Sequence, residues 1–424
     1  MEINELAKEN QELLIEIRRH IHQNPELSGV EYKTLEYIKD KLQRFNIYYE
    51  EVEDGGILGF IGNKNAEKTV LLRADIDALP ILENKRNLKR EKIVVSANDG
   101  VQHACGHDAH TAMLLVSGKI LQENASELKG RIILLFERGE EGGGNIRQLL
   151  KYIDERQIKI NGAHAIHLNP GISSGKIIAQ KGPVMAGGAG FSVTISGRDG
   201  HGSRPDIANN PLDCFVSIYE GLNSIRLKHI SPYEAFTFSV AQLSNGTRGN
   251  IIAKDLTFGG SGRFFKTEVG ARFTEEFKNI LENITKAYHC TYQIHYLFTG
   301  FPLVNNDKVT EIAQKNIREN LGKDVLISGG DPSMGSESFS LIARLYPSIM
   351  IFLGIANEEL GTGADIHNEY FDVDEETLHL GVAETIGFAL EFLNNPEPIP
   401  FARYEGKLAD LLIFKNSNKS KIII

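Results

Sequence analysis

The feature that most constrains this chain is a short segment crowded with metal-binding side chains. Residues 103–110 read HACGHDAH, which places three imidazoles, one thiol and one carboxylate within eight positions. The chain has 13 His and 3 Cys in 424 residues, so chance clustering explains the segment poorly. Ordinary core packing and solvated surfaces rarely need such a density of donors. The segment therefore predicts a metal site, and the fold must bring this loop to other donors.

Composition bounds the class of protein. The length of 424 residues suggests two or three domains, and 41% hydrophobic with 24% charged residues is ordinary for a globular protein, which excludes disordered and collagen-like chains. A net charge of -10 provides no positive field for nucleic acid or an anionic membrane. No apolar run approaches the ~20 residues of a membrane span, and the N-terminus reads as an amphipathic helix rather than a signal peptide. We therefore expect small substrates and no nucleic-acid or membrane partner.

Cysteine usage indicates the compartment. The three cysteines are far apart and odd in number, at positions 105, 214 and 290. This is not a disulfide framework, and it fits a reducing environment. We expect a cytoplasmic protein.

The order of apolar runs predicts an α/β catalytic domain in two segments, 1–184 and 300–424. Short apolar runs that look like buried strands alternate with helical patterns, and the strand runs are followed by acidic, His or Gly residues. An open α/β sheet places its ligands beyond the carboxyl ends of its strands. The expected strands are 69–74, 131–136, 163–168 and 348–354. The expected helices are 2–22, 30–44, 109–122, 145–153 and 374–393.

A different order occupies residues 185–299. Strand 190–197, helix 209–227, strands 236–243 and 254–265, helix 268–288 and strand 291–298 form a β-α-β-β-α-β pattern. This is the split βαβ order of a compact ferredoxin-like unit, so we expect an inserted domain. The last 30 residues are interpreted as a short docking segment and a tail.

Four places along the chain supply donors for a divalent metal. Cys105 and His107 are separated by one residue, so one loop can turn both toward a single point. The other places are Glu140-Glu141 after strand 131–136, His167 at the end of strand 163–168, and His367 after a Gly-rich loop. Other readings stay open at this point. His103, His110 and His164 suit structural roles, and a Glu pair at the start of a helix often only matches the helix dipole.

The chain resembles the aminoacylase and carboxypeptidase group of dinuclear-metal hydrolases. Within that group it is similar to the amidohydrolase branch that contains hippurate hydrolase and the plant indole-acetyl-amino-acid hydrolases. Eleven blocks carry the resemblance in the right order over nearly the whole chain. They are RRHIHQNPELSGVEYKT (18–34), LLRADIDALPI (71–81), HACGHDAHTAMLL (103–115), GEEGGG (139–144), HAIHLNPGISSGKI (164–177), GPVMAG (182–187), GHGSRP (200–205), GTRGNII (246–252), SGRF (261–264), SESF (336–339) and IHNEYFDVDEETLHLGV (366–382).

The resemblance implies a metallohydrolase catalytic domain, an inserted dimerisation or lid domain, and two divalent ions per subunit (Mn, Zn, Co or Ni). Glu140 would be the general base, because one of two adjacent carboxylates must stay off the metals to accept a proton. Asp77 would contact a metal ligand without binding the metal, and would thereby orient that ligand. The implied metal ligands are Cys105, His107, Glu141, His167 and His367.

The resemblance also implies roles for residues of the inserted domain. His201 would reach the active site of the opposite subunit of a homodimer, or of a higher homo-oligomer, and stabilise an oxyanion. Asn250 and Arg263 would bind substrate, since a guanidinium suits a bidentate grip on a carboxylate.

The chain departs from the family pattern at several positions. It has Glu137-Arg138-Gly139 where the family commonly has Gln-Pro-Ala, and Glu337-Ser338-Phe339 where it has Glu-Asp-Phe. Asn368-Glu369 replaces Ser-Pro, and Asp206 replaces a second His. No expected ligand and no expected base is lost, but the pocket wall changes.

We therefore expect a metal-dependent amidohydrolase that cleaves N-acyl amino acids to a carboxylate and a free amino acid. One alternative is a dipeptidase or aminopeptidase on the same scaffold, which would accept a free α-amine. Another is a non-catalytic metal-dependent binding protein. Glu140 argues against the latter, because a degenerate relative would be expected to lose its base or a ligand. A structural zinc protein fits less well still, since donors from distant loops beside a free acid suggest an open site.

Overall fold

The computed structural model describes residues 2–142 and 144–413. They form two compact units. Of these described residues, the first unit contains those up to Gly182 together with Val304–Asp331 and Leu341–Glu405, and the second contains Pro183–Leu303, Pro332–Ser340 and residues 406–413. Strand β7 (Gly182–Met185) carries the chain out of the first unit, and β14 (Leu303–Asn305) carries it back.

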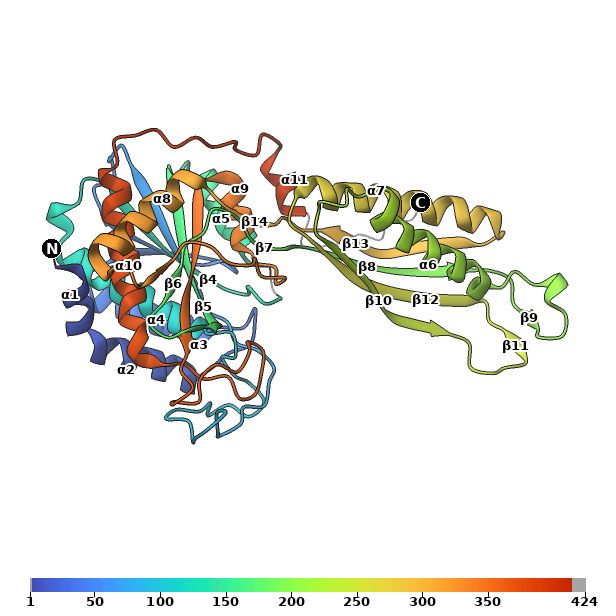
Figure 1. The fold of residues 1–424 in the computed structure, drawn as a ribbon, viewed down its shortest axis with the longest axis horizontal. Coiled ribbons are helices and arrows are strands. Elements are labelled where there is room, and N and C mark those ends of the chain that lie inside the picture. The colour runs from blue at the N-terminus through green and yellow to red at the C-terminus, as the bar shows by residue number, and fades with distance from the viewer. Residues whose placement is uncertain (1, 143, 414–424) are drawn as a thin grey trace. The chain divides into compact units, whose positions relative to one another are not determined.

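An eight-stranded mixed sheet forms the centre of the first unit (Figure 1). Its order is β1-β2-β4-β3-β5-β16-β6-β15, with antiparallel pairs β1/β2, β2/β4 and β16/β6 and parallel pairing elsewhere. The strands are β1 (Tyr48–Val52), β2 (Gly56–Gly62), β3 (Thr69–Asp75), β4 (Arg131–Glu137), β5 (Gly162–Ser173), β6 (Ile177–Ile178), β15 (Leu326–Ile327) and β16 (Ser348–Ala356).

Helices cover this sheet, and its central strands are buried on both faces. Every residue of β3 is buried, and so are all but the first of β4 and all but the last of β16. Helices α4 and α10 pack against β3 and against each other. The helices that lie within this unit are α1 (Ile3–Glu9), α2 (Gln11–Gln23), α3 (Tyr32–Arg44), α4 (His107–Glu123), α5 (Ile146–Glu155), α8 (Asp307–Asn316) and α10 (Leu378–Asn394), and short turns lie at Ala125–Glu127, Ile317–Leu321 and Glu375–Thr377.

The parallel register gathers several polar segments at one edge of the sheet. Asp75, the last residue of β3, pairs with Glu137, the last residue of β4. His167 of β5 pairs with Phe352 of β16. The carboxyl ends of parallel strands meet at the same edge, so the segments after β3, β4 and within β5 converge there.

Two expected helices are each divided into two elements, whereas the bounds of the others shift by one or two residues. The expected helix 2–22 is two helices, α1 and α2, separated at Asn10, whose side-chain amide donates to the Leu6 carbonyl oxygen at 2.8 Å. This local bond competes with continuation of the helix. The expected helix 374–393 begins with a 3-10 turn at Glu375–Thr377, because the Asp374 side chain accepts from the Glu376 amide and closes a tight turn before α10.

The second unit is a four-stranded antiparallel sheet with two helices. Its chain order is β8 (Gly187–Ser196), α6 (Pro211–Lys228), β10 (Phe236–Asn245), β12 (Asp255–Phe264), α7 (Thr267–Ala287) and β13 (Thr291–Thr299). The sheet order β10-β12-β8-β13 is the ferredoxin-like arrangement that the sequence predicts. Phenylalanines such as Phe191, Phe258 and Phe273 fill its core under α6 and α7.

Shorter elements lie outside the two main sheets. The second unit also contains β9 (Gly200–His201), β11 (Ile251–Ile252), a 3-10 turn at Pro205–Ile207 and α11 (Leu408–Ile413), while α9 (Phe339–Leu345) includes the boundary between Ser340 and Leu341. Residues 414–424 of the expected tail lie outside the described residues. Within 2–142 and 144–413, no helix combines the length and the apolar character that crossing a bilayer requires.

Candidate metal centre

A tight turn at the start of α4 presents Cys105 and His107 on either side of Gly106. Gly106 has φ of 95°, and a Cβ at this position would lie 2.8 Å from Cδ1 of Leu168. Only glycine tolerates both the left-handed backbone and the close approach. Both flanking side chains are buried, with Cys105 6% and His107 1% exposed. The turn therefore fixes a thiol and an imidazole next to each other.

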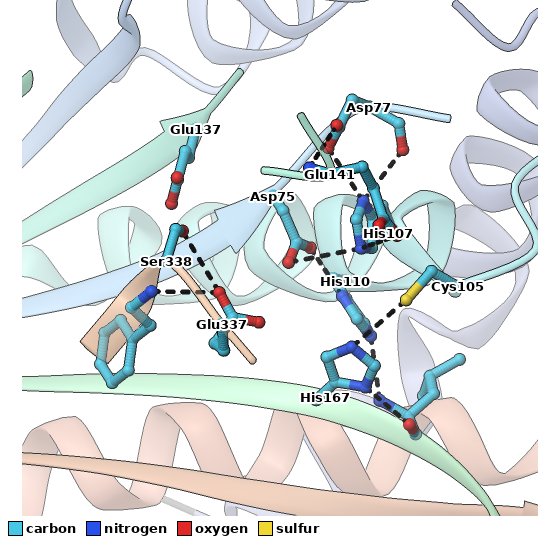
Figure 2. Close-up of polar contacts among 12 residues, drawn as sticks. Asp75, Asp77, Cys105, His107, His110, Glu137, Glu141, His167, Glu337 and Ser338 are labelled. Atoms are coloured by element: carbon cyan, nitrogen blue, oxygen red, sulfur yellow. Dashed lines mark hydrogen bonds and ion pairs between the residues drawn. The ribbon is translucent and has the colours of Figure 1, made fainter. Parts of the chain in front are cut away.

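Asp77 connects two of the candidate ligands (Figure 2). Nδ1 of His107 lies 3.0 Å from Oδ1 of Asp77 and 2.9 Å from its carbonyl oxygen. The other carboxylate oxygen, Oδ2, accepts the backbone N–H of Glu141 at 2.9 Å. An acceptor pair at Nδ1 means that this nitrogen carries the proton, which leaves the Nε2 lone pair of His107 for a metal.

The loop after β4 brings the two adjacent glutamates to the same place. Oε1 of Glu141 lies 3.0 Å from Nε2 of His367 and 3.9 Å from Nε2 of His107. Glu140 and Glu141 each have a carboxylate oxygen within 4.8 Å of a ring nitrogen of His107 and of each other. Two carboxylates are therefore available at one point beside His107.

His367 and His167 reach the cluster from two other segments. His367 has φ of 60°, an unusual backbone conformation for this residue type, and its N–H donates to the Ala104 carbonyl oxygen at 2.8 Å. This bond ties its loop to the residue before Cys105. His167 donates from Nδ1 to the Leu168 carbonyl oxygen at 2.7 Å, and its Nε2 lies 3.5 Å from Sγ of Cys105.

Potential ligand atoms form overlapping groups within 4.8 Å. One group is Cys105, His107 and His167, and another is Cys105, Glu141 and His367. Cys105 belongs to both groups, and a thiolate, unlike a neutral imidazole, can contact two cations at once. Sulfur, imidazole and carboxylate donors together suit a transition-metal divalent ion. The residues present therefore fit the two ions that the sequence predicts.

The surroundings of these groups determine which of them hold protons. Burial raises the pKa of Cys105 far above its ordinary value. Burial alone would lower the pKa of His107, but the negative charge of Asp75 and contact with Cys105 raise it. The hydrogen bond to Glu141 raises the pKa of His367. Without a metal the cluster retains protons on its ligands, and a divalent ion would displace them.

Asp75 and His110 form a supporting pair that the sequence analysis did not identify. Nδ1 of His110 lies 2.7 Å from Oδ1 of Asp75, and Nε2 of His110 accepts the backbone N–H of Leu168 at 2.9 Å. Arg73 also contacts Asp75 at 2.8 Å. The pair fixes the backbone beside His167. Its signals in the sequence are the first Asp of the RADID segment (73–77) and the last His of HACGHDAH.

His103 and His164 lie near the candidate ligands in sequence but have other surroundings in the fold. His103 is buried, and within the described residues neither of its ring nitrogens has a hydrogen-bond partner. Burial lowers its pKa to about 4, so the ring is neutral. Nε2 of His164 lies 2.7 Å from Oε2 of Glu384 inside the core. Neither residue belongs to a group of potential metal ligands among the described residues.

His201, Asn250 and Arg263 all lie in the second unit. Strands β9 and β11 pair His201 with Ile251, and the Asn250 carbonyl oxygen accepts from Gly202 N–H at 2.9 Å. The exposed His201 accepts at Nδ1 from the Ser203 amide. Arg263 on β12 donates to the Met334 carbonyl oxygen at 3.1 Å. His201 and Asn250 thus share one short ribbon, and the roles of all three residues stay predictions.

Similarity to characterised proteins extends over nearly the whole chain. The model of peptidase family M20/M25/M40 matches residues 71–390. The chain belongs to this family. As an M20/M25/M40 member it is a metal-dependent hydrolase of amide bonds, and the resemblance found in the sequence is confirmed.

Two relatives and one solved structure illustrate the range of the family. Thermostable carboxypeptidase 2 of Saccharolobus solfataricus is 32% identical over 395 residues, 92% of this chain and 97% of that protein. IAA-amino acid hydrolase ILR1-like 4 of Arabidopsis thaliana is 30% identical over 396 residues, 92% of this chain and 88% of that protein. A dinuclear metal-binding M20 peptidase of Bacillus subtilis superimposes with a TM-score of 0.76 at 25% identity, covering 91% of this chain and 99% of its own.

Proposed function

We propose that this chain is a dinuclear metalloenzyme that hydrolyses N-acyl amino acids to a carboxylate and a free amino acid. The observation that carries the proposal is the sharing of Cys105 between two groups of potential ligands. Glu140 stands beside them in a third group with His107 and Glu141. A site with two ion positions and an additional carboxylate suits water-driven hydrolysis rather than a purely structural role.

Each residue of the cluster has a proposed task. Cys105, His107 and His167 hold one ion, and Cys105, Glu141 and His367 hold the other. Two bound ions would polarise the amide carbonyl and make water acidic near neutral pH. Glu140 accepts a proton from the attacking water and passes it to the leaving nitrogen, so the products are a carboxylate and an amine. Asp77 keeps His107 and the Glu141 backbone in place.

The second unit supplies the remaining groups in this proposal. Arg263 and Asn250 bind the carboxylate of the amino-acid half, and His201 stabilises the oxyanion in the site of the neighbouring subunit of a homodimer. Exposure of His201 supports a contact outside its own unit.

Mixed dimers test the homodimer. Glu140→Gln and His201→Ala, each inactive alone, should recover activity when co-expressed, since one site per heterodimer combines an intact base with an intact His201. A monomer in solution, or heterodimers without activity, would contradict the exchange. Glu276→Gln is a control in the second unit, because the half-buried Glu276 lies on α7 and contacts His229 of the same unit at 3.2 Å.

Three carboxylates at or beside the positions where the chain departs from the family pattern could bind the amine of a substrate. Asp206 pairs with Arg204 at 2.9 Å, Glu369 accepts from Asn84 at 3.0 Å, and Glu337 accepts from Phe339 N–H at 3.0 Å. Each of these carboxylates already has a partner within the chain, so it offers fewer free acceptor positions to the ammonium group of a dipeptide. This supports a neutral acyl group, and the Arabidopsis relative named for amino-acid conjugates supports the same class.

A peptidase that accepts a free α-amine, that is a dipeptidase or an aminopeptidase, is the second candidate, and the Saccharolobus relative is itself named a peptidase, thermostable carboxypeptidase 2. A panel of N-acetyl and N-benzoyl amino acids and their matching free dipeptides, each with Mn²⁺, Co²⁺, Zn²⁺ or Ni²⁺, separates the two. We expect higher kcat/KM for the acylated substrates, and a loss of at least about tenfold on amidating the substrate carboxylate. Faster turnover of free dipeptides would favour the second candidate.

The ion in the cell and the compartment belong to the same proposal. We infer a cytoplasmic enzyme, since all three cysteines, which lie in the described part of the chain, are free and buried. The metal series of the substrate panel identifies which of the four ions supports turnover.

A further inference from the structure

We propose that Glu31 is a positioning residue for the glutamate pair of the active site. Its buried carboxylate and Arg138 form a clamp, here called the Glu31 clamp and consisting of Gly29, Glu31, Arg138 and Gly139. The clamp fixes the backbone immediately before Glu140. This inference rests on the proposed roles of Glu140 as base and Glu141 as ligand.

The carboxylate of Glu31 binds the catalytic loop directly. Glu31 has no exposed surface, and its Oε1 accepts two backbone N–H groups, from Gly139 at 2.7 Å and from Gly29 at 2.9 Å. Gly139 directly precedes the proposed base. A buried carboxylate that accepts several N–H groups makes hydrogen bonds stronger than those between neutral partners. Glu31 therefore holds one end of the glutamate loop.

Arg138 closes the clamp from the other oxygen. Its Nε donates to Oε2 of Glu31 at 2.9 Å, and its terminal nitrogen donates to the Gly29 carbonyl oxygen at 2.7 Å. The guanidinium also lies over the Tyr32 ring, 4.9 Å from the centroid. Both carboxylate oxygens of Glu31 and two side-chain nitrogens of Arg138 thus form hydrogen bonds within the clamp.

The other end of the loop is held by Asp77. Its Oδ2 accepts the Glu141 N–H at 2.9 Å, so Glu140 lies between two carboxylate anchors. Gly139 has φ of 65°, and its carbonyl oxygen accepts from Gly144 at 2.9 Å. Catalytic groups must be held within about 0.5 Å of their productive geometry. Loss of either anchor would let Glu140 and Glu141 move.

The clamp accounts for one departure of this chain from its family pattern. The family commonly has Pro-Ala where this chain has Arg138-Gly139. Proline would fix φ and stiffen the loop, whereas Gly139 adds backbone freedom. Here the Arg138 N–H donates to the Gly55 carbonyl oxygen at 3.1 Å, a bond that proline cannot make. Hydrogen bonds to Glu31 thus take the place of covalent stiffness.

Glu31→Gln tests the clamp. The amide nitrogen of the new glutamine is a donor, and it would face another donor, from either Arg138 or Gly139, so one hydrogen bond of the clamp would be lost. We expect Mn²⁺ to bind one of its two positions at least about tenfold more weakly, and kcat at saturating Mn²⁺ to fall at least about tenfold with KM nearly unchanged. Glu26→Gln is the matched control. Glu26 lies in the same segment and accepts from Thr34 on α3, so it should change neither quantity.

Arg138→Met provides a second variant and a double-mutant cycle. If the two residues act as one clamp, Glu31→Gln combined with Arg138→Met should lose little more kcat than the more damaged single variant. Wild-type Mn²⁺ affinity and kcat in Glu31→Gln, equal losses in Glu26→Gln, or additive losses in the double variant would overturn the clamp. A wild type that binds Mn²⁺ but fails on N-acyl amino acids would contradict the proposed function instead, and the Mn²⁺ titrations would still decide the clamp.

Discussion

Replacement of Asp77 by Asn should weaken metal binding while the protein stays folded. Asp77 is 1% exposed and accepts from Nδ1 of His107 at 3.0 Å and from the Glu141 N–H at 2.9 Å. Burial alone would raise the pKa of Asp77, but the hydrogen bond from His107 lowers it, so the group is ionised at neutral pH. The asparagine amide has only one acceptor oxygen, so its NH₂ group would face either His107 or the Glu141 N–H.

The magnitude follows from the lost bond. A hydrogen bond to a charged group contributes about 1.5–3 kcal/mol, which corresponds to a loss of roughly 10–150-fold in affinity. Loss of a carboxylate behind a metal ligand typically costs about 10–100-fold, which agrees.

Titration of the metal-free protein with Mn²⁺ or Zn²⁺ measures the effect. Glu384→Gln is the matched control, because Glu384 is also a buried carboxylate bonded to a histidine, His164, outside the ligand groups. Asp77→Asn with wild-type metal affinity, or a loss no larger than that of Glu384→Gln, would refute the reasoning.

Three further predictions follow from the same geometry. Glu140→Gln should keep both metals and lose about 10²–10⁴ in kcat, whereas Glu141→Gln should lose metal, as elemental analysis with kinetics will show; the reverse pattern would exchange their roles. Arg263→Met should raise KM at least about tenfold for substrates with a free carboxylate and leave amidated substrates unchanged. Burial alone would raise the pKa of Glu83, but contacts with His22 and Lys92 lower it from 4.5 to about 2. The ionised carboxylate therefore stabilises the folded protein fully above pH 4.5, and this contribution is lost as the pH falls toward 2. Glu83→Gln should therefore destabilise the protein more at pH 7 than at pH 3 in urea unfolding, and an equal loss at both pH values would count against this assignment.

The regular elements were predictable where their patterns are local. The inserted β-α-β-β-α-β order could be read from apolar periodicity, since each helix and strand buries one face. Strands β1 and β2 were not predicted, because β2 contains Gly56, Gly59 and Gly62 and is held by antiparallel pairing with β4 far along the chain. Two-residue strands such as β6 are too short to show a period.

Some residues of the candidate site could also be predicted from the sequence, and others could not. Donor-rich residues such as Cys105, His107 and His367 stand out by chemical type, and the structure brings them into overlapping groups. Asp75 and Glu31 do not stand out, because their parts depend on contacts with His110 and Arg138, which lie 35 and 107 positions away. A carboxylate that supports a site is visible only once the fold has placed its partner.

The metal content of the Cys105→Ala variant tests the central claim most directly. Sharing of Cys105 between both ligand groups predicts about two ions per chain in the wild type, and loss of metal together with loss of hydrolysis in the variant. Cys214→Ala, which removes a buried thiol in the core of the second unit, is the control and should keep both ions. Elemental analysis showing unchanged metal in Cys105→Ala would contradict the dinuclear assignment.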